Sequence, residues 1–323
     1  MDKPRVIVTR RWPEEVELRL TEHFDVRLNP EDRPLGRDDL KAAFASADAV
    51  FSTVTDAIDA ELLSTEPLRA RLIGNFGVGF NNIDIDAARA RGLTVTNTPE
   101  VLTDATADLA MALLLCIARR VGEGERHLRE GAWTGWRPTH LMGTQVTGKT
   151  LGLIGFGRIG QAMARRAHRG FDMRVLFFDP FPPADAVLRE LGAERRETVE
   201  AVLAESDFVS LHCPATPENR HLINAARLGH MKPGAFLINT ARGDVVDEAA
   251  LNDALGDRLI AGAGLDVFER EPEVLPGLLA RENVVLLPHL GSATRETRVA
   301  MGLKVLENAI AFFDGAEPPN RVT

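Results

Sequence analysis

The feature that most constrains the fold is the run Gly155-Phe156-Gly157-Arg158-Ile159-Gly160, which lies near the middle of the 323-residue chain. It follows the apolar segment 151–154 and precedes a helix-like segment, 161–166. In such a strand, turn and helix, the first glycine allows a tight turn and the second lets the backbone approach a pyrophosphate. The third allows close helix packing, and the helix N-terminus attracts the anion. The run therefore predicts a dinucleotide-binding unit that begins near residue 150.

An acidic residue follows the next predicted strand. Asp179 stands directly after segment 174–178, and Pro180 and Phe181 come next, so no arginine follows it directly. A carboxylate at this place accepts hydrogen bonds from a ribose 2′-hydroxyl and repels a 2′-phosphate. We therefore expect NAD as the cofactor, with NADP disfavoured.

The composition fits a globular chain of two domains. With 45% hydrophobic and 26% charged residues, 323 residues supply enough apolar material for substantial cores. The formal net charge of −9 gives no broad basic surface, so neither nucleic acid nor an anionic membrane is expected as a partner. The amino end runs into a strand-like segment without a signal-type apolar region, and no apolar stretch reaches ~18 residues. These features predict a cytoplasmic protein.

Cysteine and tyrosine usage excludes further classes. Cys116 and Cys213 are the two cysteines, and their spacing fits neither a disulfide framework nor a metal site. No metal is therefore expected. The chain contains no tyrosine, which excludes the reductases that depend on a catalytic phenol.

Strand-like and helix-like segments alternate along the chain. This alternation predicts parallel sheets with helices on both faces. A long apolar helix is expected from about 103 to 120, a last helix from 298 to 313, and segment 131–146, with Trp133 and Trp136, has no clear period. The strand-like segments are 6–9, 25–28, 49–53, 72–76 and 94–97 in the first part, and 151–154, 175–178, 208–211, 235–239, 261–268 and 284–287 in the second.

Three ionisable residues follow predicted strands of the second part: Arg242, Glu271 and His289. Ligands of parallel sheets bind beyond the carboxyl ends of the strands, so these residues are candidates for chemistry. An arginine can grip a substrate carboxylate with two hydrogen bonds, and a histidine, with an ordinary pKa of about 6.5, can exchange the proton that ketone reduction requires. A nearby carboxylate would favour and orient the imidazolium. Taken singly, each residue also fits a structural role: a helix cap, a solvated loop charge or a satisfied histidine.

Asp266 lies inside the apolar segment 264–268. A charge there is costly unless it is paired or hydrogen-bonded. The carboxamide of a nicotinamide is one natural partner, and a structural salt bridge is the alternative.

The sequence contains four ordered motifs: the glycine run with Asp179, segment 239–247, segment 264–268 leading to Glu271-Pro272, and segment 288–294. Together they resemble the D-isomer-specific 2-hydroxyacid dehydrogenases, and the resemblance spans nearly the whole chain. The resemblance implies a Rossmann doubly wound parallel sheet for a cofactor domain at 99–291. It also implies a flavodoxin-like α/β substrate domain formed by 1–98 and 292–323.

The resemblance also implies roles for individual residues. Arg242 would bind the substrate carboxylate and carbonyl, His289 would be the general acid/base, and Glu271 would be its partner. Backbone amides of Val78 and Gly79 would contribute to the substrate carboxylate. The residues implied to contact the cofactor are Thr106, Gly155, Gly157, Arg158, Ile159, Gly160, Asp179, Pro214, Thr240 and Asp266.

Within the family, segment 95–108 and the Trp133 to Trp136 segment are most similar to glyoxylate and hydroxypyruvate reductases. Those enzymes often prefer NADP, whereas Asp179 predicts NAD for this chain. Formate dehydrogenases carry glutamine where Glu271 stands. The family is commonly a homodimer through the cofactor domain, and the tryptophan segment would then reach the neighbouring subunit.

We therefore expect an oxidoreductase that interconverts a small 2-keto acid, glyoxylate or hydroxypyruvate, and its D-2-hydroxy acid with NAD(H). Two alternatives stay open from the sequence. One is an NAD(H)-sensing binding protein that resembles the corepressors related to this family. The other is a dehydrogenase of a bulkier or phosphorylated 2-hydroxy acid.

Overall fold

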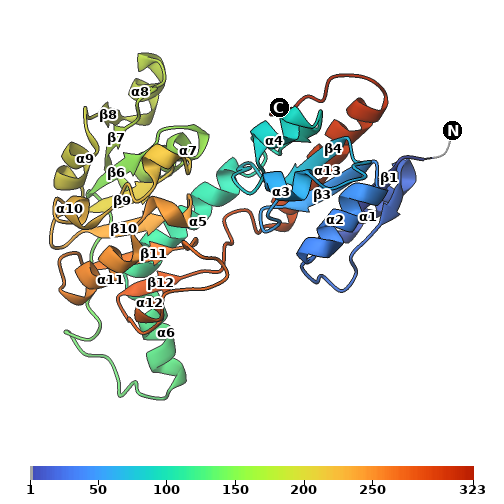
Figure 1. The fold of residues 1–323 in the computed structure, drawn as a ribbon. Coiled ribbons are helices and arrows are strands. Elements are labelled where there is room, and N and C mark those ends of the chain that lie inside the picture. Colours follow the sequence, from blue (N-terminus) through green and yellow to red (C-terminus); the bar gives the residue numbers. More distant parts are fainter. Residues whose placement is uncertain (1–2) are drawn as a thin grey trace. The chain divides into compact units, whose positions relative to one another are not determined.

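The computed structural model describes residues 3–323, which divide into two compact units (Figure 1). Unit 1 comprises the chain up to Leu102 together with Ser292–Thr323, and unit 2 is Thr103–Gly291. The sequence placed the first boundary after residue 98. The structure places it later because Val101 and Leu102 pack against the core of unit 1.

Unit 1 is built on five parallel strands in the order β2-β1-β3-β4-β5. This order is the flavodoxin-like one. The inner strands are almost entirely buried because helices cover both faces, which is why they read as continuous apolar runs. The strands are β1 Arg5–Val8, β2 Asp25–Arg27, β3 Ala49–Thr53, β4 Leu72–Phe76 and β5 Thr94–Thr96.

Alternate side chains of these strands form a separate core on each face. Val6 and Val8 pack with α1 and α13, whereas Ile7 packs with α2 and α3. The period of two along a strand thus divides one apolar run between two cores. The helices of unit 1 are α1 Glu14–His23, α2 Arg37–Ser46, α3 Ala60–Leu63, α4 Ile85–Ala90 and α13 Arg295–Phe313.

Unit 2 contains seven parallel strands in the order β12-β11-β10-β9-β6-β7-β8. This is a Rossmann sheet with one additional strand at its far edge. The α/β class and the Rossmann sheet expected from the sequence are confirmed. The strands are β6 Thr150–Ile154, β7 Arg174–Phe178, β8 Ala193–Arg195, β9 Phe208–Leu211, β10 Phe236–Asn239, β11 Gly262–Leu265 and β12 Val284–Leu286.

The sequence predicted six strands in this unit and missed β8. That strand is three residues long, and two of them, Glu194 and Arg195, are exposed and charged. An edge strand of this kind has no apolar alternation that a sequence pattern could reveal.

The helices of unit 2 cover both faces of its sheet. The apolar α5 packs on α7, β10 and β11, and residues 131–149 contain neither helix nor strand. The α-helices are α5 Thr103–Ala118, α6 Val121–Arg129, α7 Arg158–Phe171, α8 Asp185–Leu191, α9 Val199–Glu205, α10 Ala225–Leu228, α11 Glu248–Gly256 and α12 Pro276–Leu279. The 3₁₀ helices are η1 Pro217–Asn219 and η2 Gly243–Val245.

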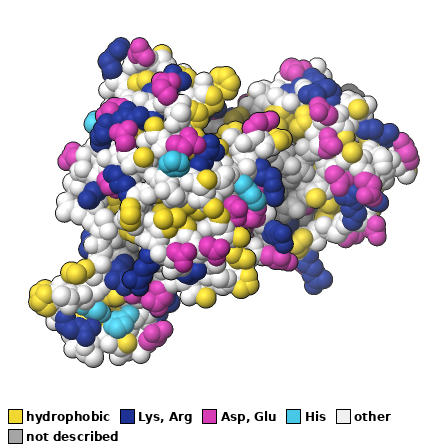
Figure 2. Space-filling view, turned by 60° about the vertical axis from the view of Figure 1, so that its left-hand side comes forward, with side chains coloured by type: hydrophobic (Ala, Val, Ile, Leu, Met, Phe, Trp, Pro, Cys, Tyr) yellow, Lys and Arg dark blue, Asp and Glu magenta, His cyan; other side chains and the backbone are white. Residues whose placement is uncertain are grey.

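The surface carries acidic and basic side chains interspersed, with smaller groups of hydrophobic ones (Figure 2). None of the helices formed by residues 3–323 combines the length and apolarity that crossing a bilayer requires.

Candidate functional site

The glycine turn follows β6, where the strand order of unit 2 reverses between β6 and β9. Gly155 has φ +91°, and a Cβ atom there would lie 2.6 Å from the backbone carbon of His212. A Cβ atom on Gly160 would lie 2.5 Å from the carbonyl oxygen of Gly155. Backbone cannot move aside as a flexible side chain can, so only glycine fits both positions.

The helix after this turn has an N-terminus without a capping side chain. Gly157 is the N-cap of α7, and Arg158 and Ile159 are the first helical residues. The first turn of α7 contains no acidic residue, and a Cβ on Gly157 would meet nothing within 4 Å. The N–H groups and positive dipole end of α7 therefore suit a phosphate.

Asp179 follows β7 and bonds to the glycine turn directly. One carboxylate oxygen accepts the N–H of Phe156 at 2.6 Å, and the other accepts the N–H of Phe181 at 2.7 Å. Each carboxylate oxygen has a second lone pair, so ribose hydroxyls can bond to the same carboxylate. Asp179 thus holds the glycine turn in place and remains an acceptor.

The other residues expected at the cofactor lie at the carboxyl ends of β9, β10 and β11. Pro214 follows β9 and is exposed, and its carbonyl accepts the side chain of Asn219. Thr240 follows β10 and is buried, and its Oγ1 has no hydrogen-bond partner within residues 3–323. A buried hydroxyl is rarely unpaired in a native protein. The free hydroxyl and the open glycine turn fit a dinucleotide.

His289 and Glu271 form a close pair. The Nδ1 atom of His289 lies 2.7 Å from Oε2 of Glu271, and the N–H of Phe268 donates to Oε1 of Glu271. Burial raises the pKa of Glu271, but the bond to His289, the charge of His289, the Phe268 N–H and Arg242 outweigh it, so the net shift is downward. Glu271 is therefore a carboxylate near neutral pH, and it orients the ring so that Nε2 is the nitrogen on the opposite edge.

Arg242 is presented by a tight turn after β10. The side chain of Asn239 donates to the carbonyl of Arg242 and accepts the N–H of Ala241, which closes the turn. Burial lowers the pKa of the Arg242 guanidinium, and Glu271 opposes that shift. Guanidinium groups stay charged in proteins, so Arg242 is a partly desolvated cation beside the His289–Glu271 pair.

Asp266 has partners that the sequence did not predict. Its carboxylate accepts the N–H groups of Leu290 at 2.6 Å and Gly291 at 2.8 Å, and its carbonyl accepts the N–H of His289. Thr106 donates its hydroxyl to the carbonyl of Gly291. His289 has φ +54°, a left-handed conformation that these bonds hold in place. Asp266 and Thr106 thus fix the loop that carries the histidine.

A second histidine of this unit, His212, lies behind the glycine turn. Burial lowers the pKa of His212 to about 4, and its Nε2 bonds to the hydroxyl of Ser210. His212 is therefore neutral near pH 7 and is a poor proton donor.

In unit 1, the turn after β4 carries Val78 and Gly79. The carbonyl of Gly77 accepts the N–H of Thr98, and the carbonyl of Val78 accepts the side chain of Asn97. In a planar trans peptide the N–H points opposite to the preceding C=O. The N–H groups of Val78 and Gly79 consequently point away from these partners.

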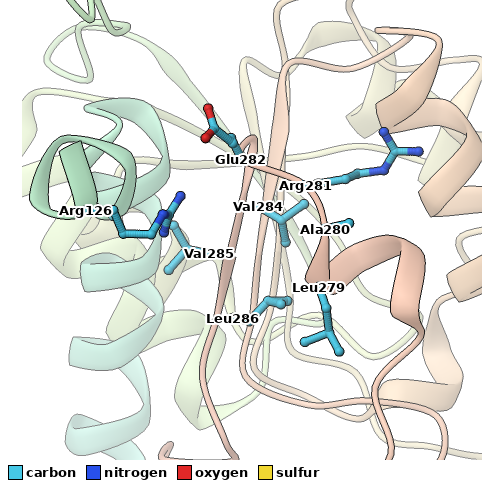
Figure 3. A pocket seen from close by; sticks show the side chains of 9 residues that line it. Arg126, Leu279, Ala280, Arg281, Glu282, Val284, Val285 and Leu286 are labelled. Atoms are coloured by element: carbon cyan, nitrogen blue, oxygen red, sulfur yellow. The ribbon is translucent and has the colours of Figure 1, made fainter. Parts of the chain in front are cut away.

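A cavity of about 440 Å³ lies elsewhere in unit 2, between α6 and the chain around β12 (Figure 3). Arg126 of α6 points toward Val285, while Arg281 bonds to Asn252 of α11. None of the predicted site residues lines this cavity, so it is separate from the candidate site.

Comparison with known proteins gives one family. Residues 111–291 match the NAD-binding domain of the D-isomer specific 2-hydroxyacid dehydrogenases, which is more than half of the chain. The chain belongs to this family.

Similar proteins cover the whole chain. It is 49% identical to a glyoxylate reductase of Korarchaeum cryptofilum, over 99% of this chain and 96% of that enzyme. A D-isomer specific 2-hydroxyacid dehydrogenase from Polaromonas superimposes with a TM-score of 0.93 at 36% identity, over 99% of this chain and 100% of that chain. An NADPH-dependent glyoxylate/hydroxypyruvate reductase of Sinorhizobium meliloti, solved with NADP and malonate, superimposes with a TM-score of 0.88 at 36% identity. This match covers 100% of this chain and 97% of that chain.

The family membership predicted from the four motifs is thus confirmed. The chain is a nicotinamide-dependent oxidoreductase that acts on 2-keto and 2-hydroxy acids.

Proposed function

We propose that the protein reduces glyoxylate or hydroxypyruvate to the corresponding 2-hydroxy acid, which has the D configuration where it is chiral, with NADH as the electron donor. The observation that carries the proposal is the 2.7 Å contact between His289 and Glu271, beside the Arg242 cation in a Rossmann unit. The glyoxylate reductases at about half identity over the full chain support the substrate class.

In this proposal each side chain has one task. Arg242 binds the substrate carboxylate in a bidentate grip and thereby orients the keto group. His289, held through Nδ1 by Glu271, donates a proton from Nε2 to the oxygen that becomes the hydroxyl. A bound reduced nicotinamide supplies the hydride. The return reaction uses neutral His289 as the base.

We propose that Val78 and Gly79 donate their backbone N–H groups to a substrate carboxylate. Their orientation opposite to two occupied carbonyls supports this role.

We propose that NADH is preferred over NADPH because Asp179 repels a 2′-phosphate. The Sinorhizobium relative is NADPH-dependent, so the preference requires its own test. Replacing Asp179 by asparagine removes the charge. We expect the ratio of kcat/KM for NADH to that for NADPH to fall about tenfold, equivalent to about 1.4 kcal/mol, and an unchanged ratio would contradict the assignment.

A homodimer through unit 2 is also proposed. An open groove between α5 and α7 exposes apolar Leu115 and Phe171 between the acids Asp104 and Asp108 and the base Arg169. Asp104 and Asp108 pair with Arg166 of the same chain, and Arg169 pairs with Glu190, so a two-fold interface would mainly bury the apolar part of the groove. Exposed Ala112 lies in this groove, so Ala112→Arg should yield a monomer by light scattering. An unchanged dimer would assign the interface to another surface, such as the loop with Trp133 and Trp136.

The deciding experiment is a substrate panel followed at the NADH absorbance band, with glyoxylate, hydroxypyruvate, pyruvate, bulkier 2-keto acids and phosphorylated ones. Turnover with the first two supports the proposal. Preference for a bulkier or phosphorylated acid would assign that acid as the substrate, and tight NADH binding without turnover would indicate a sensor.

We also propose a cytoplasmic location, which the free thiols of Cys116 and Cys213 support. Cell fractionation tests this location.

A further inference from the structure

We propose that Glu248 is a positioning residue for the reaction: it sets the place of Glu271, and through it of His289, by holding the backbone that carries Glu271. The inference rests on the proposed roles of Glu271 and His289. Neither the sequence motifs nor the mechanism above assigns a task to Glu248.

The first observation is a buried contact at the start of α11. Glu248 is 8% exposed, and its Oε1 accepts the N–H of Glu269 at 2.7 Å. Glu269 lies between Phe268, whose N–H donates to Glu271, and Glu271 itself. The bond from Glu248 therefore fixes the middle of the short segment that presents the carboxylate partner of His289.

The second observation is the cost of this carboxylate. Burial raises the pKa of Glu248, and the charges of Glu269 and Glu271 raise it further, against the N–H of Glu269 and the charge of Arg270. A solvated acid would fill the first turn of α11 at lower cost, because Asp247 already caps this helix through the N–H of Ala250. Capping therefore does not explain why the Glu248 carboxylate is buried beside two others.

A second tether holds the same segment through the side chain of Glu269. Oε1 of Glu269 lies 2.5 Å from Nε2 of His221, and Nδ1 of His221 lies 3.9 Å from a carboxylate oxygen of Asp247. Arg220 also faces Glu269, at 3.9 Å. The main chain of Glu269 is thus held by Glu248 and its side chain by His221.

The backbone of this segment also adjoins the turn that presents Arg242. A Cβ atom on Gly243 would lie 1.9 Å from the backbone carbon of Phe268 and 2.3 Å from the nitrogen of Glu269. The two backbone segments are in direct contact, so a displacement of residues 268–271 would disturb Arg242 as well as Glu271. Glu248 consequently controls the relative placement of all three proposed catalytic groups.

The test compares four variants of the full-length enzyme. Glu248→Ala removes the acceptor, Glu248→Gln keeps an amide oxygen at the same reach, and Glu248→Asp withdraws the carboxylate by one methylene. Asp253→Asn changes an exposed acid on the same helix and is the matched control. Measured for each are kcat, KM for glyoxylate, the NADH dissociation constant, the pH profile of kcat/KM and the melting temperature.

We expect Glu248→Ala to lower kcat by about tenfold to a hundredfold, since a displacement of ~1 Å can cost that much. The NADH dissociation constant should stay within about twofold of wild type, because the substitution changes the orientation of the catalytic groups and not the dinucleotide site. The pH profile of kcat/KM should change as well, because the contact between Glu271 and His289 is displaced. Glu248→Gln should retain most activity, and Glu248→Asp should fall between them.

A lowered melting temperature with unchanged kcat and an unchanged pH profile would overturn the inference, as would a glutamine variant as damaged as the alanine variant. If Glu248→Ala does not fold, the aspartate and glutamine variants carry the test. His289→Gln separates the two proposals. Full activity in His289→Gln would refute the proposed mechanism. If His289→Gln loses activity while Glu248→Ala retains wild-type activity, the positioning role alone is refuted.

Discussion

The two sheets share parallel topology, yet the points where their strand orders reverse are filled differently. In unit 1, between β1 and β3, a buried Asp56 accepts the hydroxyl of Thr9 at 2.6 Å and the N–H of Thr53 at 2.7 Å. In unit 2, between β6 and β9, glycine backbone occupies the corresponding place. Side chains fill the first crevice, whereas at the second a Cβ atom on Gly157 would meet nothing within 4 Å. Ligand capacity is therefore set by the few residues after the strands and not by the fold.

The proposed mechanism assigns the reacting groups to unit 2, and the largest expected effect tests that assignment. His289→Gln should lower kcat by about 10² to 10⁴, the range of a lost general acid. NADH binding, measured by fluorescence titration, should be unchanged because the dinucleotide site is intact. His127→Gln on α6 is the matched control. Wild-type turnover in the His289 variant would show that another group is the general acid.

Paired glycine substitutions sharpen the comparison. Gly155→Ala places Cβ against immobile backbone at φ +91°, and left-handed strain alone costs about 1–2 kcal/mol. We expect NADH affinity to fall at least about tenfold. Gly77→Ala in unit 1 meets the methyl group of Val54 at 2.7 Å, a side chain that can shift. That variant should bind NADH as wild type does, and equal losses in both variants would break the comparison.

The filled crevice of unit 1 should matter for stability alone. Asp56→Ala leaves the buried donors of Thr9 and Thr53 without an acceptor, at a cost of about 1–3 kcal/mol. Urea unfolding should show this loss while the NADH dissociation constant stays constant. A changed dissociation constant would mean that this crevice also serves the cofactor.

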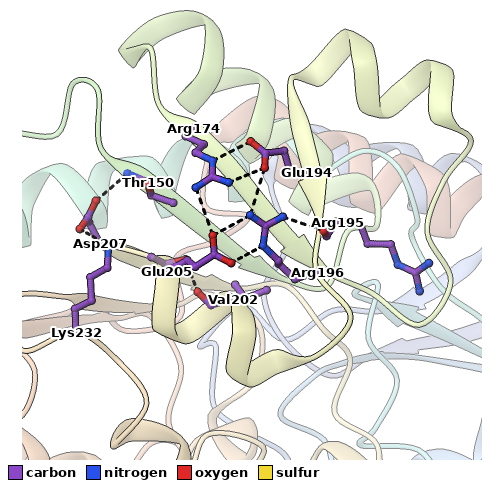
Figure 4. Close-up of polar contacts among 10 residues, drawn as sticks. Thr150, Arg174, Glu194, Arg195, Arg196, Val202, Glu205, Asp207 and Lys232 are labelled. Atoms are coloured by element: carbon purple, nitrogen blue, oxygen red, sulfur yellow. Dashed lines mark hydrogen bonds and ion pairs between the residues drawn. The ribbon is translucent and has the colours of Figure 1, made fainter.

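The smallest effect concerns the β8 edge of unit 2, where Glu194 and Glu205 alternate with Arg174 and Arg196 (Figure 4). The bond to Arg174 lowers the pKa of Glu194 from 4.5 to about 2. A carboxyl group with a depressed pKa stabilises the fold above its unfolded pKa and loses this contribution as the pH falls. Between pH 4.5 and about 2, wild type should therefore lose more stability than Glu194→Gln.

The difference should stay below about 1 kcal/mol because these side chains are nearly half exposed. Thermal melts of both proteins across that pH range measure it. A Glu194→Gln melt that falls in parallel with wild type would show that this ion pair contributes nothing.

Sequence patterns predicted the long-range order of the fold well. Inner strands such as β3, β4 and β9 matched their predicted bounds because parallel strands covered on both faces must be apolar throughout. The exposed strand β8 and the polar helix α6 lacked that signal. The glycine turn was predictable because its chemistry lies within six consecutive residues.

The candidate site was predictable in its residue types but not in its supports. Arg242, Glu271 and His289 each follow a strand, and topology brings such residues together. Asp266 was visible as a charge in an apolar run, but its bonds to Leu290 and Gly291 depend on how a distant loop folds. Glu248 gave no signal, since an acid in the first turn of a helix is ordinary. Burial by tertiary packing is what distinguishes it.

The distribution of tryptophan gives the enzyme built-in optical reporters. Trp12 is 5% exposed and contacts Phe51 and Phe76 in unit 1, whereas Trp133 and Trp136 of unit 2 are 53% and 82% exposed. With no tyrosine present, emission on excitation near the ultraviolet absorption maximum comes from indole alone. A quencher such as acrylamide should silence the two exposed indoles first, leaving Trp12 as a label-free probe of how unit 1 unfolds.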